Sequence, residues 1–261
     1  MISAGEVPAL LEEAKKKMDG PFLPSKSVAK VVFVGDTHTA VDVTQKVFDT
    51  YYEAVDLIVF LGDYVDRGDT GVENLGLILS KFVDDRNKIV MLRGNHESPL
   101  TNFHYGFASE VASKFGEDGY QKFKDFFSVM PYATVVNGYF CAHGGIAMDL
   151  HKVEELMSLP TGDANPDNPT AFQVLWNDPR DMIDGFIPSV RGEGAFYFGA
   201  DVTEKFLSEN ELKGIIRAHE VVNGFREDMG GKVITVFSSR YHGGQAGALV
   251  IEGDKMEQQV L

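Results

Sequence analysis

The stretch KVVFVGDTH (residues 30–38) is a run of β-prone apolar residues that stops at a glycine and then supplies an aspartate and a histidine. The same arrangement returns twice, in LIVFLGDYVDRG (57–68) and IVMLRGNHE (89–97). The carboxyl ends of parallel strands meet at one edge of a sheet, so these polar side chains are expected to lie close together. The recurrence predicts a fold organised around a functional edge.

The residue types at these strand ends point to metal chemistry. Asp36 and His38 are expected to complete one metal site, with Asp63 as the carboxylate that bridges to a second site. Asn95 belongs to that second site, and its remaining ligands are expected from two later strand ends, His143 in AHGG (142–145) and His219 in RAHE (217–220). Mixed nitrogen and oxygen ligands favour manganese, iron or zinc over calcium.

The alternative is that each of these residues only stabilises the turn in which it lies and binds no metal. A single Asp-x-His after a strand is more often turn chemistry, and a single histidine at a strand end is more often a hydrogen-bonded structural residue. Five such positions in one chain, each at an expected strand end, favour the metal interpretation. With Arg67 and His96 suited to a phosphate ester, the residues predict a two-metal phosphoesterase.

Bulk properties limit the classes of function. The 261 residues carry 39 acidic and 24 basic side chains, a net charge of −15. This charge argues against a nucleic-acid partner and against binding to an anionic membrane surface. No secretory pattern and no apolar run of about 18 residues is present, so we expect a cytoplasmic protein. The single cysteine, Cys141, fits a buried strand better than a thiolate nucleophile.

The order of elements predicts an α/β fold. Strands at 30–34, 56–61 and 88–92 alternate with helices at 41–53 and 71–83, followed by helices near 99–115 and 119–129; this order predicts parallel pairing. Asn137-Gly138 predicts a hairpin between 132–136 and 139–142. A stretch rich in Gly, Pro, Asp and Asn (160–200) is expected to be irregular and to form site walls. A helix near 202–209 and strands at 214–218, 232–237 and 246–251 follow, the last two read as antiparallel.

The change from parallel to antiparallel pairing predicts a central β-sandwich of two mixed sheets flanked by α-helices. We expect one catalytic domain over 1–261, because no linker interrupts the pattern. Residues 6–18 have the spacing of an amphipathic helix. We expect that helix to pack on the domain, with a partner-binding helix as the alternative.

The strings at 35–38, 62–68 and 92–97 resemble the three signatures of the phosphoprotein phosphatase family, the metal-dependent protein Ser/Thr phosphatases among the calcineurin-like metallophosphoesterases. The resemblance extends from about residue 30 to 250, through Tyr105-Gly106-Phe107, His143-Gly144-Gly145, Trp176-Asn177-Asp178-Pro179, Arg191-Gly192, Phe198-Gly199, Arg217-Ala218-His219 and Phe237-Ser238-Ser239-Arg240-Tyr241. It implies a sandwich with metals at its upper edge and two divalent ions, of which we expect manganese, with iron or zinc as alternatives.

The resemblance also assigns catalytic roles. His96 is similar to the general acid that protonates the leaving oxygen, and Asp66 to the carboxylate that orients it. Arg67 and Arg191 are similar to the phosphate-binding arginines, because guanidinium groups pair with phosphate oxygens; a surface salt bridge is the alternative for Arg191. Tyr241 resembles a phosphate-contacting tyrosine of the site, with a packed aromatic as its alternative.

Asn95 is expected to bind phosphate as well as metal. Asp178 is expected either to support a metal-bound histidine or to be a turn residue before Pro179. Three positions depart from the family pattern: Thr39 replaces a glycine, Phe103 takes the place of an arginine, and His242 replaces a cysteine. We expect these departures to affect substrate preference and inhibitor sensitivity more than the chemistry.

The resemblance implies a phosphatase for phosphoserine and phosphothreonine proteins. A hydroxide that bridges the two metals would attack the phosphorus directly, without a phosphoenzyme. The rival enzyme is a diadenosine-tetraphosphate hydrolase or another small-molecule phosphoesterase of the same superfamily. A non-catalytic phosphoprotein-binding scaffold is the remote alternative, and the sequence names no regulatory subunit.

Overall fold

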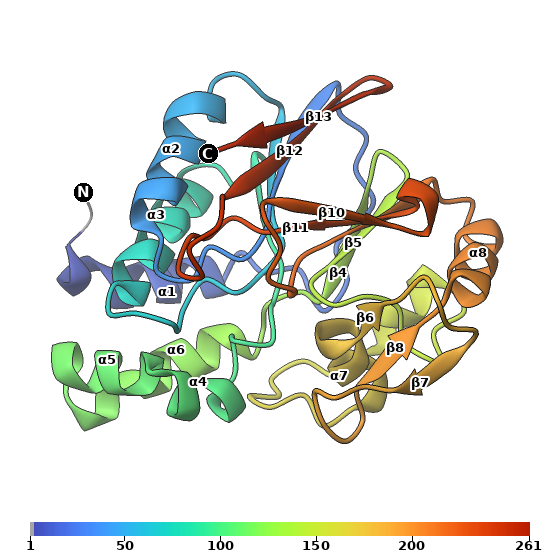
Figure 1. The fold of residues 1–261 in the computed structure, drawn as a ribbon. Helices are drawn as coiled ribbons and strands as arrows, with labels where there is room; N and C mark the ends of the chain where they lie inside the picture. The colour runs from blue at the N-terminus through green and yellow to red at the C-terminus, as the bar shows by residue number, and fades with distance from the viewer. Residues whose placement is uncertain (1–2) are drawn as a thin grey trace.

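Two five-stranded sheets face each other across a shared apolar layer in the computed structural model, which describes residues 3–261 (Figure 1). The first sheet has the order β13-β12-β1-β2-β3 and the second β10-β11-β9-β5-β4. The layer between them includes Phe33 and Leu57 from the first sheet and Ile216 and Val236 from the second, all fully buried. The predicted α/β fold with a central sandwich of two mixed sheets is confirmed.

The strands are short, from two to six residues each. They are β1 (Lys30–Val34), β2 (Leu57–Phe60), β3 (Ile89–Met91), β4 (Ala133–Val136), β5 (Tyr139–Ala142), β6 (Asp178–Pro179), β7 (Phe186–Pro188), β8 (Phe196–Phe198), β9 (Gly214–Arg217), β10 (Phe225–Asp228), β11 (Val233–Val236), β12 (Gly247–Glu252) and β13 (Lys255–Val260).

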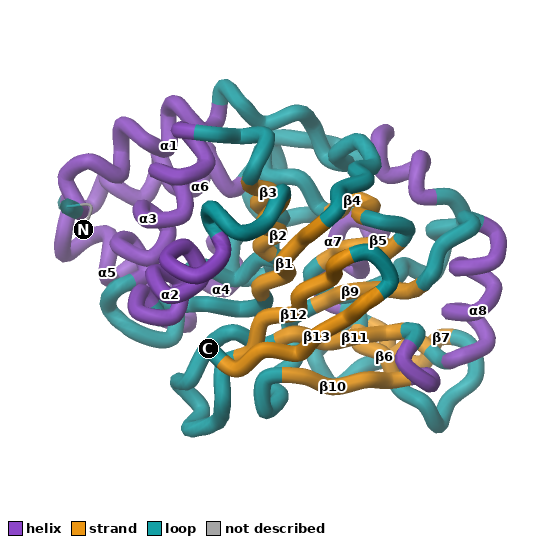
Figure 2. Tube along the Cα trace, turned by 90° about the horizontal axis from the view of Figure 1, so that it is seen from above, coloured by secondary structure: helices purple, strands orange, loops and turns teal. Residues whose placement is uncertain are grey.

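Helices cover the two outer faces of the sandwich (Figure 2). They are α1 (Val7–Lys15), α2 (Val41–Tyr51), α3 (Gly71–Asp84), α4 (Pro99–Tyr105), α5 (Phe107–Phe115), α6 (Tyr120–Phe127), α7 (Pro169–Trp176) and α8 (Ala200–Glu209), with 3-10 turns at Ala4–Glu6, Glu117–Gly119, Val153–Ser158 and Met229–Gly231. Helices α1, α2, α3 and α6 pack with the first sheet in one apolar cluster, and α7 and α8 with the second in another.

The parallel core of the first sheet matches the prediction. Val31 pairs with Leu57 and Ile58 with Ile89, both in parallel register. On its other side β1 pairs antiparallel with β12, from Lys30–Glu252 to Val34–Ala248. In the second sheet the predicted hairpin joins β4 and β5, and β5 runs parallel to β9. Both sheets therefore point strand carboxyl ends at the same region of the sandwich.

The predicted helix near 99–115 is two helices. Gly106 has a left-handed backbone, with φ of 112°, and separates α4 from α5. Glycine adopts this conformation without the Cβ clash that other residues suffer. The break changes the direction of the chain between Tyr105 and Phe107.

The prediction that 160–200 is irregular was wrong in part. Helix α7 begins after Asn168, whose side chain accepts hydrogen bonds from the backbone N–H groups of Thr170 and Ala171. A small third sheet, ordered β6-β8-β7, follows it. Its strands have only two or three residues each, too few for a period-2 pattern to show in the sequence.

Two further differences concern the last strands. The strands predicted at 232–237 and 246–251 do not pair with each other, because β11 and β12 belong to different sheets. Each instead has an antiparallel neighbour that was not predicted, β10 for β11 and β13 for β12. Both missing strands, FRED and KMEQQV, are polar edge strands.

Helix α1 lies inside the range expected for an N-terminal helix. Its residues Val7, Leu11 and Ala14 are buried in the cluster with α3 and α6, so it packs on the fold as the first interpretation expects. Within residues 3–261, no helix combines the length and the apolar character that crossing a bilayer requires.

The start of α3 depends on a carboxylate from another helix. Thr70, at the N-cap of α3, makes no side-chain cap hydrogen bond. Instead Glu110 of α5 accepts the N–H groups of Gly71 and Val72 at 3.0 and 2.8 Å. A carboxylate at a helix N-terminus satisfies otherwise unpaired amides and interacts favourably with the helix dipole.

We expect Glu110→Ala to lower the free energy of unfolding by about 1–2 kcal/mol, because it leaves two amides at a helix start without their acceptor. Urea denaturation measures the loss. Glu154→Ala, at an exposed position in the first turn of a 3-10 segment, is the matched control and should change stability by less than about 0.5 kcal/mol. Equal losses in the two variants would show that the capping contact contributes nothing.

Candidate metal centre

The loops after β1, β2 and β9 meet at one edge of the sandwich and contain strained backbone conformations. Eight non-glycine residues within 3–261 have positive φ, and five of them are proposed site residues: His38, Asp63, Asp66, Arg67 and His219. Positive φ is costly for residues with a Cβ and persists where the surroundings hold it in place. The concentration of strain at this edge marks it as functional.

Two glycines allow the loops after β2 and β3 to approach each other. A Cβ on Gly62 would lie 2.5 Å from the backbone nitrogen of Gly94, and a Cβ on Gly94 would lie 2.2 Å from Oδ1 of Asp63. Side chains at either position would separate the loops. The glycines that end β-prone runs in the sequence are therefore required by the contact between the loops.

Glu97 joins the two loops. Its carboxylate accepts the N–H groups of Asp63, Tyr64 and Gly94, each at 2.8 Å. Burial and the nearby charge of Asp63 raise the pKa of Glu97 to about 7. In the sequence, Glu97 directly after Asn95-His96 favours the protein phosphatase branch of the superfamily, but no pattern there predicts these backbone contacts.

The first group of ligand atoms surrounds His38. Its Nε2 lies 3.9 Å from Oδ2 of Asp36 and 3.9 Å from Oδ2 of Asp63. All three residues are at least 98% buried. His38 Nδ1 is 2.7 Å from the carbonyl oxygen of Val65, so it donates a proton there and leaves Nε2 as a bare acceptor.

The second group lies on the other side of Asp63. His143 Nε2 is 3.3 Å from Asp63 Oδ1, 2.9 Å from Asn95 Oδ1 and 3.2 Å from His219 Nδ1. His143 Nδ1 lies 2.9 Å from the carbonyl oxygen of Leu61 and donates to it. When the ring is neutral, its Nε2 is an acceptor and lies next to the acceptor atoms of Asp63 and Asn95.

These contacts fit divalent cations. Acceptor atoms that converge in a buried space repel each other unless a cation lies among them. His219 joins the second group through Nδ1, 2.9 Å from Asn95 Oδ1; its other ring nitrogen, Nε2, lies 4.0 Å from Asp178 Oδ1 and has no hydrogen-bond partner. Two groups of ligands that share Asp63 match a pair of divalent ions.

The pKa directions show that burial disfavours the charged form of Asp36, His38 and His219; for His143, burial alone would lower the pKa, but the charge of Asp63 raises it. Burial and the charge of Asp63 raise the pKa of Asp36 to about 7. Burial and the neighbouring charge of His96 lower the pKa of His38 to about 4. Burial, together with Arg191 and other cations, lowers the pKa of His219 well below its ordinary value. Neutral imidazoles are the form that binds metals.

His96 differs from the other histidines. Its Nδ1 is 2.7 Å from Oδ2 of Asp66, and its Nε2 is 4.0 Å from Oδ2 of Asp63. Although burial alone would lower it, the pKa of His96 is raised by Asp63 and by the hydrogen bond with Asp66. A proton on Nε2 would face the same space as the ligand groups, which suits a proton donor better than a metal ligand.

Asn102 holds this pair in place and was not singled out in the sequence. Its Nδ2 donates to Oδ2 of Asp66 at 2.9 Å and to the carbonyl oxygen of His96 at 2.7 Å. The N–H of Phe107 donates to Oδ1 of Asp66 at 2.8 Å. Asn102 lies six residues beyond His96, and no local pattern in the sequence indicates this contact.

Arg67 lies at the mouth of the site between two tyrosines. Its guanidinium carbon is 4.0 Å from the ring centre of Tyr105 and 5.8 Å from that of Tyr241. The Tyr241 ring contacts His38 edge-on at 5.3 Å. Tyr241 therefore lines the site, and Tyr105, whose role the sequence did not suggest, supports the arginine.

Arg191 reaches the same region from the loop between β7 and β8. It forms an ion pair with Asp178, which is also paired with Arg217 at 2.8 Å. Asp178 does not hydrogen-bond His219, so the expected support of a metal-bound histidine is not made directly. Asp178 instead positions two arginines, one of them the proposed phosphate-binding residue.

The departures from the family pattern have different settings. The side chain of Thr39 packs on Gly68, and its carbonyl oxygen accepts from the hydroxyl of Thr70. Phe103 is 68% exposed and its ring lies 5.4 Å from that of Tyr120. His242 packs edge-on against Phe237. Cys141 is buried, and burial raises the pKa of its thiol, which agrees with the strand interpretation.

Comparisons with known proteins point to one family. A family model described as calcineurin-like phosphoesterase matches residues 29–223. The serine/threonine-protein phosphatase 6 catalytic subunit of Caenorhabditis elegans is 37% identical over 69% of this chain, and a probable serine/threonine-protein phosphatase of Encephalitozoon cuniculi is 34% identical over 94%. The chain spans 55% of the length of each of these relatives.

A solved structure of a protein phosphatase is similar to this chain over its full length. It is that of a protein serine/threonine phosphatase from Saccharomyces cerevisiae with similarity to human phosphatase PP5. The two chains share 25% identity with a TM-score of 0.91, covering 100% of this chain and 90% of the other.

We expect Mn²⁺ to raise the thermal unfolding temperature of chelator-treated protein, because a cation that binds only the folded state stabilises it by mass action. His219→Asn should reduce this shift by at least half, since it removes a ligand from one group. Differential scanning fluorimetry measures both. His151→Asn, at an exposed position outside the site, should keep the full shift; a loss there as large as in His219→Asn would contradict the assignment.

Proposed function

The chain belongs to the calcineurin-like phosphoesterase family, and from this membership and the geometry of its site we propose that it is a metal-dependent protein serine/threonine phosphatase. The observation that carries the proposal is the arrangement around Asp63. Two groups of buried ligand atoms share this carboxylate, and His96, a histidine that can be protonated, lies beside the first group with its Nε2 4.0 Å from Oδ2 of Asp63. This arrangement combines metal binding with proton donation at one point.

The proposed cofactors are two divalent ions, manganese first, with iron or zinc as alternatives. Asp36, His38 and Asp63 would hold one ion, and Asp63, Asn95, His143 and His219 would hold the other. When bound, the ions would supply an activated water and neutralise part of the phosphate charge. Ligands of mixed nitrogen and oxygen type suit all three of these metals.

The residues of the chain supply the remaining parts of phosphoester hydrolysis. Arg67 and Arg191 are positioned to bind phosphoryl oxygens from the mouth of the site, where guanidinium groups can form paired hydrogen bonds. Tyr105 and Tyr241 flank Arg67, and Asp178 holds Arg191. These contacts fix both cations before the substrate arrives, so less ordering is needed on binding.

His96 is proposed as the general acid. Asp66 accepts the Nδ1 proton of His96 and favours the protonated ring, so that Nε2–H can be given to the leaving oxygen of the substrate. An alkoxide from serine or threonine is a poor leaving group, and its protonation is the step that needs such a donor. The phosphoryl group would pass directly to water.

The proposed substrates are phosphoserine and phosphothreonine residues of proteins. The similarity to serine/threonine-protein phosphatases supports this choice, and Arg67 and Arg191 would bind the phosphate at the mouth of the site. Dinucleoside polyphosphates are the alternative substrate class within the same superfamily. No feature of the site favours them over phosphoproteins.

We expect His96→Asn to reduce turnover of a phosphoserine peptide about 10²–10⁴-fold, the usual contribution of general acid catalysis. Turnover of p-nitrophenyl phosphate should fall much less, because nitrophenolate leaves without protonation. Steady-state assays of both substrates, with metal content measured in the same samples, provide the test.

His104→Asn is the matched control, since His104 is exposed on the neighbouring helix α4. It should leave both activities unchanged. Equal losses on the two substrates in His96→Asn, with metal still bound, would remove the acid role from His96.

Substrate class is tested by assaying phosphoserine, phosphothreonine and phosphotyrosine peptides beside diadenosine tetraphosphate, each with Mn²⁺ and with Zn²⁺. We expect the highest kcat/KM for the first two peptides. A strong preference for the dinucleotide would overturn the proposed substrate while leaving phosphoester hydrolysis in place.

A further inference from the structure

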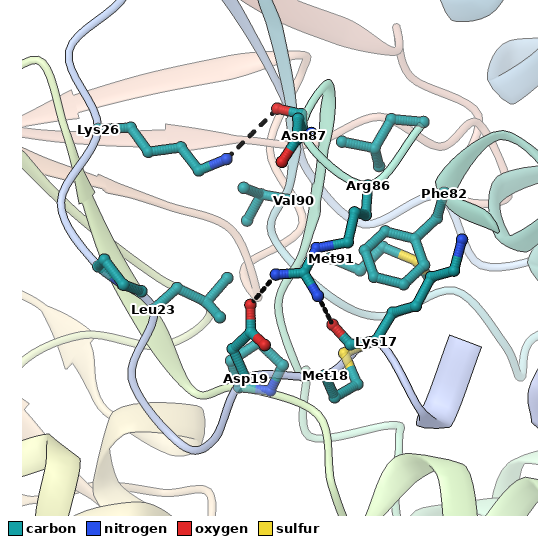
Figure 3. Close-up of a pocket in the computed structure, with 13 residues that line it drawn as sticks. Lys17, Met18, Asp19, Leu23, Lys26, Phe82, Arg86, Asn87, Val90 and Met91 are labelled. Atoms are coloured by element: carbon teal, nitrogen blue, oxygen red, sulfur yellow. Dashed lines mark hydrogen bonds and ion pairs between the residues drawn. The ribbon is translucent and has the colours of Figure 1, made fainter. Parts of the chain in front are cut away.

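A cavity lies beside β3, and all three residues of that strand, Ile89, Val90 and Met91, line it (Figure 3). Its volume is about 230 Å³, and its wall comes from the segment after α1, the extended stretch before β1, the end of α3 and β3 itself. Phe82, Val90 and Met91 form an apolar floor and are at most 5% exposed. None of its lining residues belongs to the candidate metal centre.

The rim of this cavity is positively charged. Lys17, Lys26 and Arg86 line it together with one carboxylate, Asp19, which is paired with Arg86. The ammonium groups of the two lysines are bonded only to backbone carbonyl oxygens, of Val83 for Lys17 and of Asn87 for Lys26. Within residues 3–261, neither lysine has a carboxylate oxygen within 4.0 Å.

Two observations show that this local charge is unusual. The chain as a whole carries a net charge of −15. The side chains that line the cavity, by contrast, include three cations and one anion. The pKa of Lys26 is lowered, first by partial burial and then by the charge of Arg86, which the charges of Asp19 and Asp85 do not fully offset. A further anion beside Lys26 would favour its charged form.

The size of the cavity limits its occupant. Sites for cofactors and drug-sized ligands usually enclose about 300–1,000 Å³, more than this cavity provides. A volume of about 230 Å³ accommodates one large apolar side chain with part of its backbone. The charged side chains at the rim of the cavity would then contact the residues on either side of the inserted residue.

We propose that this cavity is a docking site for an acidic segment of a partner protein, which inserts one apolar side chain against Phe82, Val90 and Met91 and places flanking carboxylates against Lys17, Lys26 and Arg86. The apolar floor supplies contact area for the anchor. The cationic rim selects acidic neighbours and rejects basic ones. The site is separate from the proposed phosphatase centre, and its occupation does not depend on that activity.

The probes are four peptides, acetyl-Glu-Glu-X-Glu-Glu-amide with X as Leu, Ile, Met or Phe. Binding is followed by NMR of the chain labelled with ¹³C-methyl methionine. Met18 and Met91 line the cavity, whereas Met182 is 94% exposed and lies elsewhere. We expect at least one peptide to shift the Met18 and Met91 signals with a Kd below about 1 mM, leaving Met182 unchanged.

Charge and anchor are tested separately. Replacing the glutamates of the peptide by lysine, or X by serine, should weaken binding by at least about tenfold. In the protein, Lys26→Glu should do the same, and Lys26→Met, which keeps the aliphatic stem, should give a smaller loss. Lys213→Glu makes the same charge change at an exposed position outside the cavity and should bind as the parent chain does.

Several results would overturn the proposal. They are an absence of Met18 and Met91 shifts with all four peptides, equal binding of the lysine peptides, or equal losses in Lys213→Glu and Lys26→Glu. Shifts of the same methyl groups with protein concentration alone would identify a self-association surface instead. Because binding is measured without turnover, failure of this proposal is distinguishable from failure of the proposed phosphatase activity.

Discussion

The carboxylate of Glu97 determines how the loops after β2 and β3 lie relative to each other. It accepts three backbone amides, two from the β2 loop and one from its own loop. A buried acid with three such partners resists displacement, because any movement leaves an N–H group unpaired in an apolar surrounding. The position of Asp63 follows from this contact, and both groups of metal ligands are built around Asp63.

The same edge of the sandwich draws on both sheets. Asp36, Asp63 and Asn95 follow strands of the first sheet, whereas His143 and His219 follow β5 and β9 of the second. The N–H of His219 donates to Oδ1 of Asp36 at 2.8 Å, which joins the two halves directly. The site is thus a junction between sheets, and the small third sheet adds Arg191 to it through Asp178.

The parts of the fold that the sequence predicts are those in which burial leaves a pattern. Apolar strands followed by glycine and a polar ligand identified the parallel core and the candidate ligands at its edge. Strands β10 and β13 escaped prediction because edge strands such as Phe225–Asp228 and Lys255–Val260 are polar. Helix α7 could have been found, since Asn168 and Pro169 form a helix-start signal.

The residues that support the site are harder to predict than the ligands. Glu97, Asn102 and Tyr105 act through contacts between segments, and the sequence contains no local pattern for such contacts. Asp178 shows the same limit: its ion pairs with Arg191 and Arg217 depend on where three separate elements meet. The ligand types are visible in the sequence, whereas the network that orients them depends on contacts that form only in the folded chain.

The pairing of β1 with β12 has a consequence for synthesis of the chain. Lys30 and Glu252 are partners in one antiparallel ladder, so β1, the central strand of its sheet, stays open on one side until almost the whole described chain has left the ribosome. Contacts between such distant residues are slow to form. During translation β1 therefore has an unpaired, strongly apolar edge, and such an edge is prone to aggregation until β12 pairs with it.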